Sequence, residues 1–165
     1  MRWRHPVRGL VMPGEFISVA EDAGLMIGFG AWAIDEACRH AATLPNHIHV
    51  AVNVSALQFY SSDLPNVVDA ALRRHAIDPA RLELEVTEHV VLRNEAVTLM
   101  TLQQLKALGV RIALDDFGTG YSSLSYLQRF AFDKVKIDRS FVHSIAGDPV
   151  NAAVVRAVLS IGKDL

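Results

Sequence analysis

Short apolar runs recur along the chain and predict β-strands. They cover residues 49–54, 82–87, 110–114 and 133–138. The first run is almost wholly apolar, which is typical of a strand that is covered on both faces. In the second run Glu83 and Glu85 alternate with leucines, and in the fourth Lys134 and Lys136 alternate with apolar residues. The pattern therefore predicts four strands, two of which have one polar face.

Longer stretches with apolar residues at helical spacing separate these strands and predict helices. They cover residues 13–23, 27–43, 63–74, 94–108, 122–128 and 149–165. Pro13 and Pro149 suit the first turn of a helix, and Gly24 and Gly109 suit its end. Because a crossover helix returns the chain to the same end of a sheet, strands alternating with helices predict an α/β fold with parallel strands. No linker or internal repeat divides residues 1–165, so we expect a single domain.

Each predicted strand carries a polar residue near the end toward which it runs. These residues are Asn53, Glu85, Asp115, Asp116 and Lys136. The carboxyl ends of parallel strands face the same way, so these side chains would meet on one rim of the sheet. A helix cap or a solvated turn explains any one of them. Their convergence on one rim favours a functional cluster.

The chemistry of this rim favours hard cations. Asn53, Glu85, Asp115 and Asp116 offer only oxygen atoms, which Mg²⁺, Mn²⁺ and Ca²⁺ accept as ligands. Two such ions can polarise a phosphodiester and lower the pKa of a bound water, so hydrolysis of a phosphate ester is the natural reaction class. Lys136 would orient the water or stabilise developing charge, and a plain ion pair with the acids is the alternative explanation.

Composition and charge limit the other classes of function. A share of 51% hydrophobic residues in a chain of 165 is enough for one buried core. The formal charge of −2 gives no reason to bind a nucleic acid polymer, and no apolar run has the length of a membrane span or a signal peptide. Cys38, the only cysteine, excludes a disulfide framework and is typical of a small core residue in a reducing compartment. We therefore expect a cytoplasmic domain.

Seven short motifs are spread over nearly the whole chain. They are RWRHP at 2–6, PGEFI at 13–17, AEDAGL at 20–25, VNVS at 52–55, EVTE at 85–88, DDFGTGYSSL at 115–124 and KID at 136–138. Together they resemble the EAL-domain family of bacterial phosphodiesterases, which open cyclic di-GMP to a linear dinucleotide. The resemblance implies that the sheet belongs to a TIM-like (β/α) barrel.

Carried over position by position, the resemblance assigns roles to residues of the rim and its loops. It implies metal ligands at Asn53, Glu85, Asp115 and Asp116, water activation by Lys136, contact with the dinucleotide by Arg2, and steadying of the glycine loop by Glu88. The ions would be Mg²⁺ or Mn²⁺, and cyclic di-GMP would be the ligand. The implied reaction is the two-metal hydrolysis of cyclic di-GMP to linear pGpG.

The sequence also departs from the family pattern at both ends. The glutamate of the tripeptide that names the family should precede Arg2, and later strands of the family would lie beyond Leu165. Residues 2–4 look like the end of a strand that begins outside the sequence. We therefore expect residues 1–165 to be one incomplete domain, a partial barrel whose first and last strands are missing. Open sheet edges invite self-association, and a homodimer through the loop and helix from Asp115 to Gln128 is one expected form.

Three functional hypotheses follow from the sequence. The first is a cyclic di-GMP phosphodiesterase domain that is cut short. The second is a catalytically inactive module that binds cyclic di-GMP or a partner protein, which the absence of the first glutamate favours. The third is a structural dimerisation unit that uses the helix predicted over 122–128.

Overall fold

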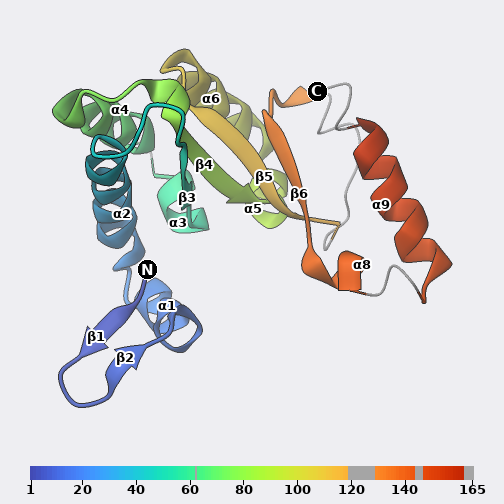
Figure 1. Ribbon diagram of the computed structural model, residues 1–165, viewed down its shortest axis with the longest axis horizontal. Helices are drawn as coiled ribbons and strands as arrows, with labels where there is room; N and C mark the ends of the chain where they lie inside the picture. The colour runs from blue at the N-terminus through green and yellow to red at the C-terminus, as the bar shows by residue number, and fades with distance from the viewer. Residues whose placement is uncertain (62, 119–128, 144–146, 162–165) are drawn as a thin grey trace.

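Four parallel strands form the central sheet of the protein. The computed structural model describes residues 1–61, 63–118, 129–143 and 147–161 and is shown in Figure 1. The strands are β3 (Val50–Asn53), β4 (Leu82–Thr87), β5 (Arg111–Phe117) and β6 (Lys134–Ile137), and each pairs in parallel with the next along the chain. β3, β4 and β6 coincide with predicted runs, and β5 begins in the run predicted over 110–114 but continues to Phe117. The predicted α/β fold, with parallel strands alternating with helices, is therefore confirmed.

The longer helices lie close to the predicted ranges. They are α1 (Pro13–Asp22), α2 (Met26–Ala41), α4 (Leu64–His75), α6 (Glu95–Ala107) and α9 (Pro149–Ile161). The structure adds α3 (Ala56–Phe59), η1 (Pro79–Arg81), α5 (Glu88–Arg93) and α8 (Arg139–His143), which are too short to show a helical period in the sequence. The helix predicted over 122–128 lies outside the described residues. Within the described part of the chain, no helix combines the length and the apolar character that a membrane span requires.

One face of the sheet is apolar and carries the core. Val52, Leu84 and Ile112 point to this face and belong to one cluster with buried side chains of α2, α4 and α6. These three helices follow one another along the sheet (Figure 1). Cys38 of α2 is fully buried in the cluster, as predicted for a small core residue, and burial raises the pKa of its thiol to about 11.

The opposite face of the sheet is polar. Residues opposite one another in neighbouring parallel strands point to the same face, and the register pairs Asn53 with Glu85, Glu85 with Ala113, and Ala113 with Lys134. Ala51 and Asn53 are exposed on this face, so the prediction that the first strand is covered on both faces is wrong. The reason is that β3 forms an edge of the described sheet and its valines all point to the face covered by helices.

A separate two-stranded sheet precedes the parallel one. β1 (Trp3–His5) and β2 (Gly9–Val11) pair antiparallel and lie with α1 beside the start of α2 (Figure 1). His5 closes the turn between them, because its Nδ1 accepts hydrogen bonds from the backbone N–H groups of Val7 and Arg8 at 3.1 Å each. The strand predicted near Trp3 is therefore one arm of a hairpin, whose second arm was not predicted.

Arg81 fixes the connection between α2 and β3. The residue is only 6% exposed. Its guanidinium donates hydrogen bonds to the backbone carbonyls of Ala41, Leu44, Pro45 and Ile48 and to the side-chain oxygen of Asn46, at 2.7 to 3.3 Å. A buried cation is costly unless it is hydrogen-bonded, and here the acceptors come from the end of α2 and the loop after it. Arg81 therefore holds the start of β3 at a fixed place beside β4.

Candidate functional site

Lys136 joins three strands at the rim of the sheet. Its Nζ, on β6, donates hydrogen bonds to Oε2 of Glu85 on β4 at 2.8 Å and to Oδ2 of Asp115 on β5 at 3.0 Å. Burial alone would lower the pKa of Lys136, but the hydrogen bonds to these two carboxylates outweigh it and hold that pKa above its usual value. The structure thus brings together three of the predicted rim residues around one cation.

A bulge in β5 presents the two adjacent acids. Leu114 is opposite Val135, and Phe117 is opposite Ile137. Two residues of β5, Asp115 and Asp116, therefore lie opposite one residue of β6, which is Lys136. The prediction that this strand ends where the acids begin is wrong, because the bulge absorbs one residue and pairing resumes at Phe117. Bulges of this kind redirect side chains next to functional sites.

Asp116 owes its position to an unusual backbone conformation. Its φ of 54° lies in the left-handed region, and its backbone N–H donates to Oδ1 of Asp115 at 3.0 Å. The side chain of Asp116 is exposed at the rim, yet partial burial and the negative charges of Asp115 and Asp138 raise its pKa above the usual value. A nearby cation would relieve this repulsion, which is the electrostatic setting expected for a metal ligand.

Asn53 lies next to this cluster at the end of β3. It is opposite Glu85 in the register and shares its face of the sheet. Within the described residues, no three His, Cys, Asp or Glu side chains gather as a metal-binding group. The candidate donors are instead two carboxylates that already share one cation, with the Asn53 amide and Asp116 beside them. Oxygen donors of this kind fit a hard divalent cation as part of its ligand sphere.

Glu88 and Phe141 hold the loop that follows the two acids. Glu88 begins α5, is 3% exposed, and accepts a hydrogen bond from the backbone N–H of Gly118 at 3.0 Å. Gly118 has a φ of 100°, and a Cβ at this position would lie 2.8 Å from Cε2 of Phe141 on α8. Only glycine therefore fits between the two side chains. Gly120, the second glycine of this loop, lies outside the described residues.

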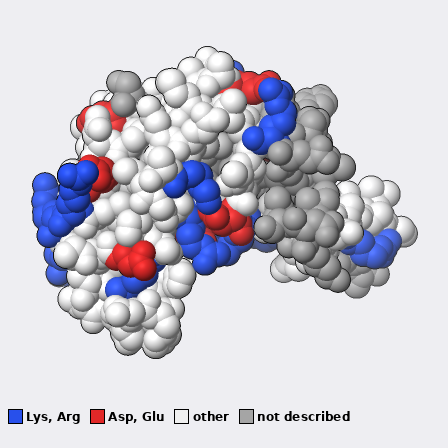
Figure 2. All heavy atoms as spheres, turned by 90° about the horizontal axis from the view of Figure 1, so that it is seen from above, with Lys and Arg blue, Asp and Glu red and all other residues white. Residues whose placement is uncertain are grey.

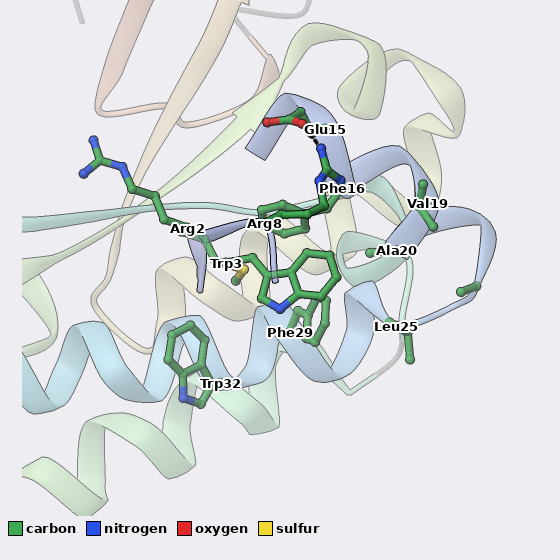
Figure 3. Close-up of a pocket in the computed structure, with 12 residues that line it drawn as sticks. Arg2, Trp3, Arg8, Glu15, Phe16, Val19, Ala20, Leu25, Phe29 and Trp32 are labelled. Atoms are coloured by element: carbon green, nitrogen blue, oxygen red, sulfur yellow. Dashed lines mark hydrogen bonds and ion pairs between the residues drawn. The ribbon is translucent and has the colours of Figure 1, made fainter. Parts of the chain in front are cut away.

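Arg2 directly precedes β1 of the antiparallel hairpin. It borders an open cavity of about 630 Å³ whose other lining residues include Trp3, Phe16, Phe29 and Trp32. Figure 3 shows the Arg2 side chain pointing away from the aromatic rings, while Arg8 pairs with Glu15 on the cavity wall. No ion pair within the described residues connects Arg2 to the carboxylates of the rim, so its contact with a dinucleotide stays a prediction.

A second group of charges lies on the same face, nearer the starts of the strands. Nζ of Lys134 lies 2.6 Å from Oε1 of Glu83, and Nε of Arg111 lies 3.9 Å from its Oε2. These residues line a cavity of about 250 Å³. Figure 2 shows the molecule from above relative to the view of Figure 1. Acidic and basic side chains lie next to one another near the middle of Figure 2. The sequence placed Glu83 on the face of Glu85, but it did not reveal which lysine each glutamate contacts.

The EAL domain family model matches residues 1–165, and the chain belongs to this family. It is 46% identical to the bifunctional diguanylate cyclase/cyclic di-GMP phosphodiesterase MucR of Pseudomonas aeruginosa, over 100% of this chain and 25% of the relative. It is 38% identical to the cyclic di-GMP phosphodiesterase PdeR of Escherichia coli, again over 100% of this chain and 25% of the relative. The chain thus spans a quarter of the length of these two relatives.

A solved structure supports the same assignment. The PaMucR phosphodiesterase in complex with c-di-GMP matches with a TM-score of 0.93 and 45% identity, covering 99% of this chain and 68% of that chain. The match to a solved EAL domain also confirms the predicted TIM-like character of the fold.

Proposed function

We propose that this EAL domain belongs to a cyclic di-GMP phosphodiesterase. The reaction adds one water to a phosphodiester bond of cyclic di-GMP, breaks one P–O bond and yields linear pGpG. The observation that carries the proposal is the Lys136 ammonium, shared by Glu85 and Asp115 at the rim of a parallel sheet. Two relatives that match all of this chain are named as cyclic di-GMP phosphodiesterases, which supports the choice of substrate.

The residues of the rim would have two roles, metal binding and orientation of the attacking water. Asn53, Glu85, Asp115 and Asp116 would hold divalent cations, Mg²⁺ or Mn²⁺, which supply Lewis acidity and lower the pKa of a bound water. Lys136 would orient that water, because its ammonium already lies between two of the proposed ligands.

Residues outside the rim would serve binding and loop position. Arg2 would contact cyclic di-GMP, and Glu88 would hold the loop at Gly118 by the hydrogen bond that the structure shows. A homodimer through the segment from Asp115 to Gln128, a segment largely outside the described residues, stays part of the proposal.

The proposal is tested in the whole protein that carries residues 1–165, by measuring pGpG formed from cyclic di-GMP. We expect Glu85→Gln and Lys136→Met each to lower turnover about 100-fold or more, which is the usual effect of removing one preorganised charge from an active site. Lys106→Met is the matched control. Nζ of Lys106 lies 2.6 Å from Oδ1 of Asp133, and this ion pair is at the start of β6 rather than at the rim. Unchanged turnover in both rim variants would contradict the proposal.

A non-catalytic module is the second candidate function. The observation that favours it is that the described residues do not bring three acidic side chains together as a metal-binding group. Calorimetry with cyclic di-GMP separates the two candidates, because a module would bind the dinucleotide and form no pGpG with either Mg²⁺ or Mn²⁺ present. Binding together with product formation would exclude the module.

A further inference from the structure

Two lysines of β6 reach across β5 to two glutamates of β4. Glu83 and Glu85 are two residues apart on β4, as Lys134 and Lys136 are on β6, and all four side chains share the polar face. Neighbouring strands are spaced so that β4 and β6 lie about 10 Å apart, within the combined reach of a lysine and a glutamate. Ala113 of β5, which lies between them, offers no side chain beyond its Cβ, so the crossing is open.

The pairing is not the one that the register alone would produce. Lys134 and Glu85 both lie opposite Ala113 and are therefore level with each other across the sheet. Lys134 nevertheless contacts Glu83, one level nearer the strand starts, at 2.6 Å. Glu85 is paired instead with Lys136, at 2.8 Å. Lys134 and Lys136 thus lie on the same face of the sheet as Glu85, but among the described residues Glu85 forms an ion pair with Lys136 and not with Lys134.

Charge balance explains why Lys134 contacts Glu83 rather than Glu85. The side chain of Glu83 is 5% exposed, and a buried carboxylate requires a cation or hydrogen-bond donors. Arg111 lies 3.9 Å from it, which is too long for a hydrogen bond, so Lys134 supplies the close contact. Lys134 itself is 47% exposed and borders a cavity of about 250 Å³, so its side chain has room to turn. If residue 83 were neutral, the strongest partner left for the Lys134 ammonium would be the Glu85 carboxylate, which is level with Lys134 across the sheet.

We propose that Glu83 is a positioning residue that draws the ammonium group of Lys134 away from Glu85, and so keeps Glu85 available to Lys136 and to a divalent cation. The part that concerns the cation rests on the function proposed above. Glu83 touches neither metal nor substrate in this arrangement and acts through Lys134. Without Glu83, the Lys134 ammonium would bind the Glu85 carboxylate and would compete there with a divalent cation.

The test compares Glu83→Gln, Lys134→Met and the double variant in the whole protein. Mn²⁺ binding is measured by calorimetry without substrate, and metal-free crystal structures show where Lys134 lies. We expect Glu83→Gln to bind Mn²⁺ about tenfold more weakly or worse, as is typical when a residue that orients a metal ligand is lost. Its structure should show the Lys134 ammonium hydrogen-bonded to Glu85. The double variant should regain the affinity of the parent, and Lys134→Met alone should keep it.

Asp69→Asn is the matched control, since Asp69 forms an ion pair with Arg73 on an exposed helix face. Thermal unfolding confirms that each variant compared is folded, and Glu83→Met replaces Glu83→Gln if a buried amide prevents folding. A double variant that binds Mn²⁺ as weakly as Glu83→Gln would overturn the inference, since Glu83 would then be merely structural. So would a Lys134 side chain turned to solvent in Glu83→Gln. If the parent binds no Mn²⁺, the proposed metal site fails, and the position of Lys134 alone decides this inference.

Discussion

At the scale of single residues, the ammonium group of Lys136 allows two carboxylates of neighbouring strands to lie beside the same atom. Glu85 and Asp115 would repel each other if both were ionised with no cation between them. The distances of 2.8 and 3.0 Å to Lys136 show how this repulsion is offset. The same two carboxylates suit a divalent cation, because the ion would supply the positive charge between them that the lysine now supplies.

Glu88 is expected to affect the loop more than the fold. Its buried carboxylate accepts the N–H of Gly118, two residues after Asp116. We expect Glu88→Ala to lower turnover of cyclic di-GMP more than about tenfold, and the free energy of unfolding by about 1.5–3 kcal/mol, which is the usual range for a hydrogen bond to a charged group. Product formation and urea unfolding of the same preparation check both values.

Glu88→Gln is the matched control for this prediction. The amide keeps an oxygen that can accept the N–H of Gly118, so this variant should retain more turnover than Glu88→Ala. If turnover falls only as far as the folded fraction falls, Glu88 has a structural role and no separate effect on the loop.

The positions of the rim residues were predictable because they follow from strand direction alone. Glu85, Asp115 and Lys136 lie near the carboxyl ends of successive parallel strands, and parallel order leaves them on one rim. The contact between Phe141 and Gly118 was not predictable, because it depends on the conformations of two loops and leaves no periodic trace in the sequence.

At the scale of elements, the sequence predicted those parts of the fold that hydrophobic periodicity controls. β3, β4 and β6 and the longer helices belong to this group. Elements that depend on single hydrogen bonds were missed, such as the hairpin whose turn is closed by the imidazole of His5. The bulge in β5 was missed for a similar reason, since its extra residue depends on the left-handed conformation of Asp116.

Arg81 is expected to contribute more to stability than any pattern in the sequence suggests. Arg81→Met keeps an apolar stem but leaves carbonyl groups such as those of Ala41 and Ile48 without this donor. We expect the free energy of unfolding to fall by roughly 3 kcal/mol, because several charge-assisted hydrogen bonds are lost in a buried place. Chemical denaturation measures this value.

Arg73→Met is the matched control for Arg81. The Arg73 side chain is 80% exposed and forms an ion pair with Asp69. Its replacement should change the free energy of unfolding by about 0.5 kcal/mol or less, as is usual for a surface pair. Similar losses in the two variants would mean that the hydrogen bonds of Arg81 contribute no more than an exposed ion pair.

At the scale of the whole molecule, the rim depends on what adjoins the edges of the sheet. Within the described residues, β3 and β6 each have a neighbouring strand on one side only. The matched PaMucR structure is longer, since the chain covers 68% of it. Unpaired strand edges expose backbone N–H and C=O groups, and they leave the side chains at the rim less constrained than in a closed sheet.

We therefore expect residues 1–165 alone to hydrolyse cyclic di-GMP far more slowly than the same residues in a protein extended at both ends. Asn53, Glu85, Asp115 and Asp116 supply only part of the ligand sphere of two ions. A water molecule can replace a missing carboxylate, but the ion then binds more weakly and is less firmly oriented, so both metal occupancy and in-line attack suffer.

The measurement is the rate of pGpG formation by the two proteins at equal concentration, with Mg²⁺ and with Mn²⁺. Comparable rates would contradict the expectation and would mean that the four proposed ligands and Lys136 suffice for catalysis. Activity confined to the extended protein, with unfolding transitions that show both proteins to be folded, would mean that the rim requires ligands from outside residues 1–165. The carboxylates that share Lys136 would then be one part of a larger site that residues outside 1–165 complete.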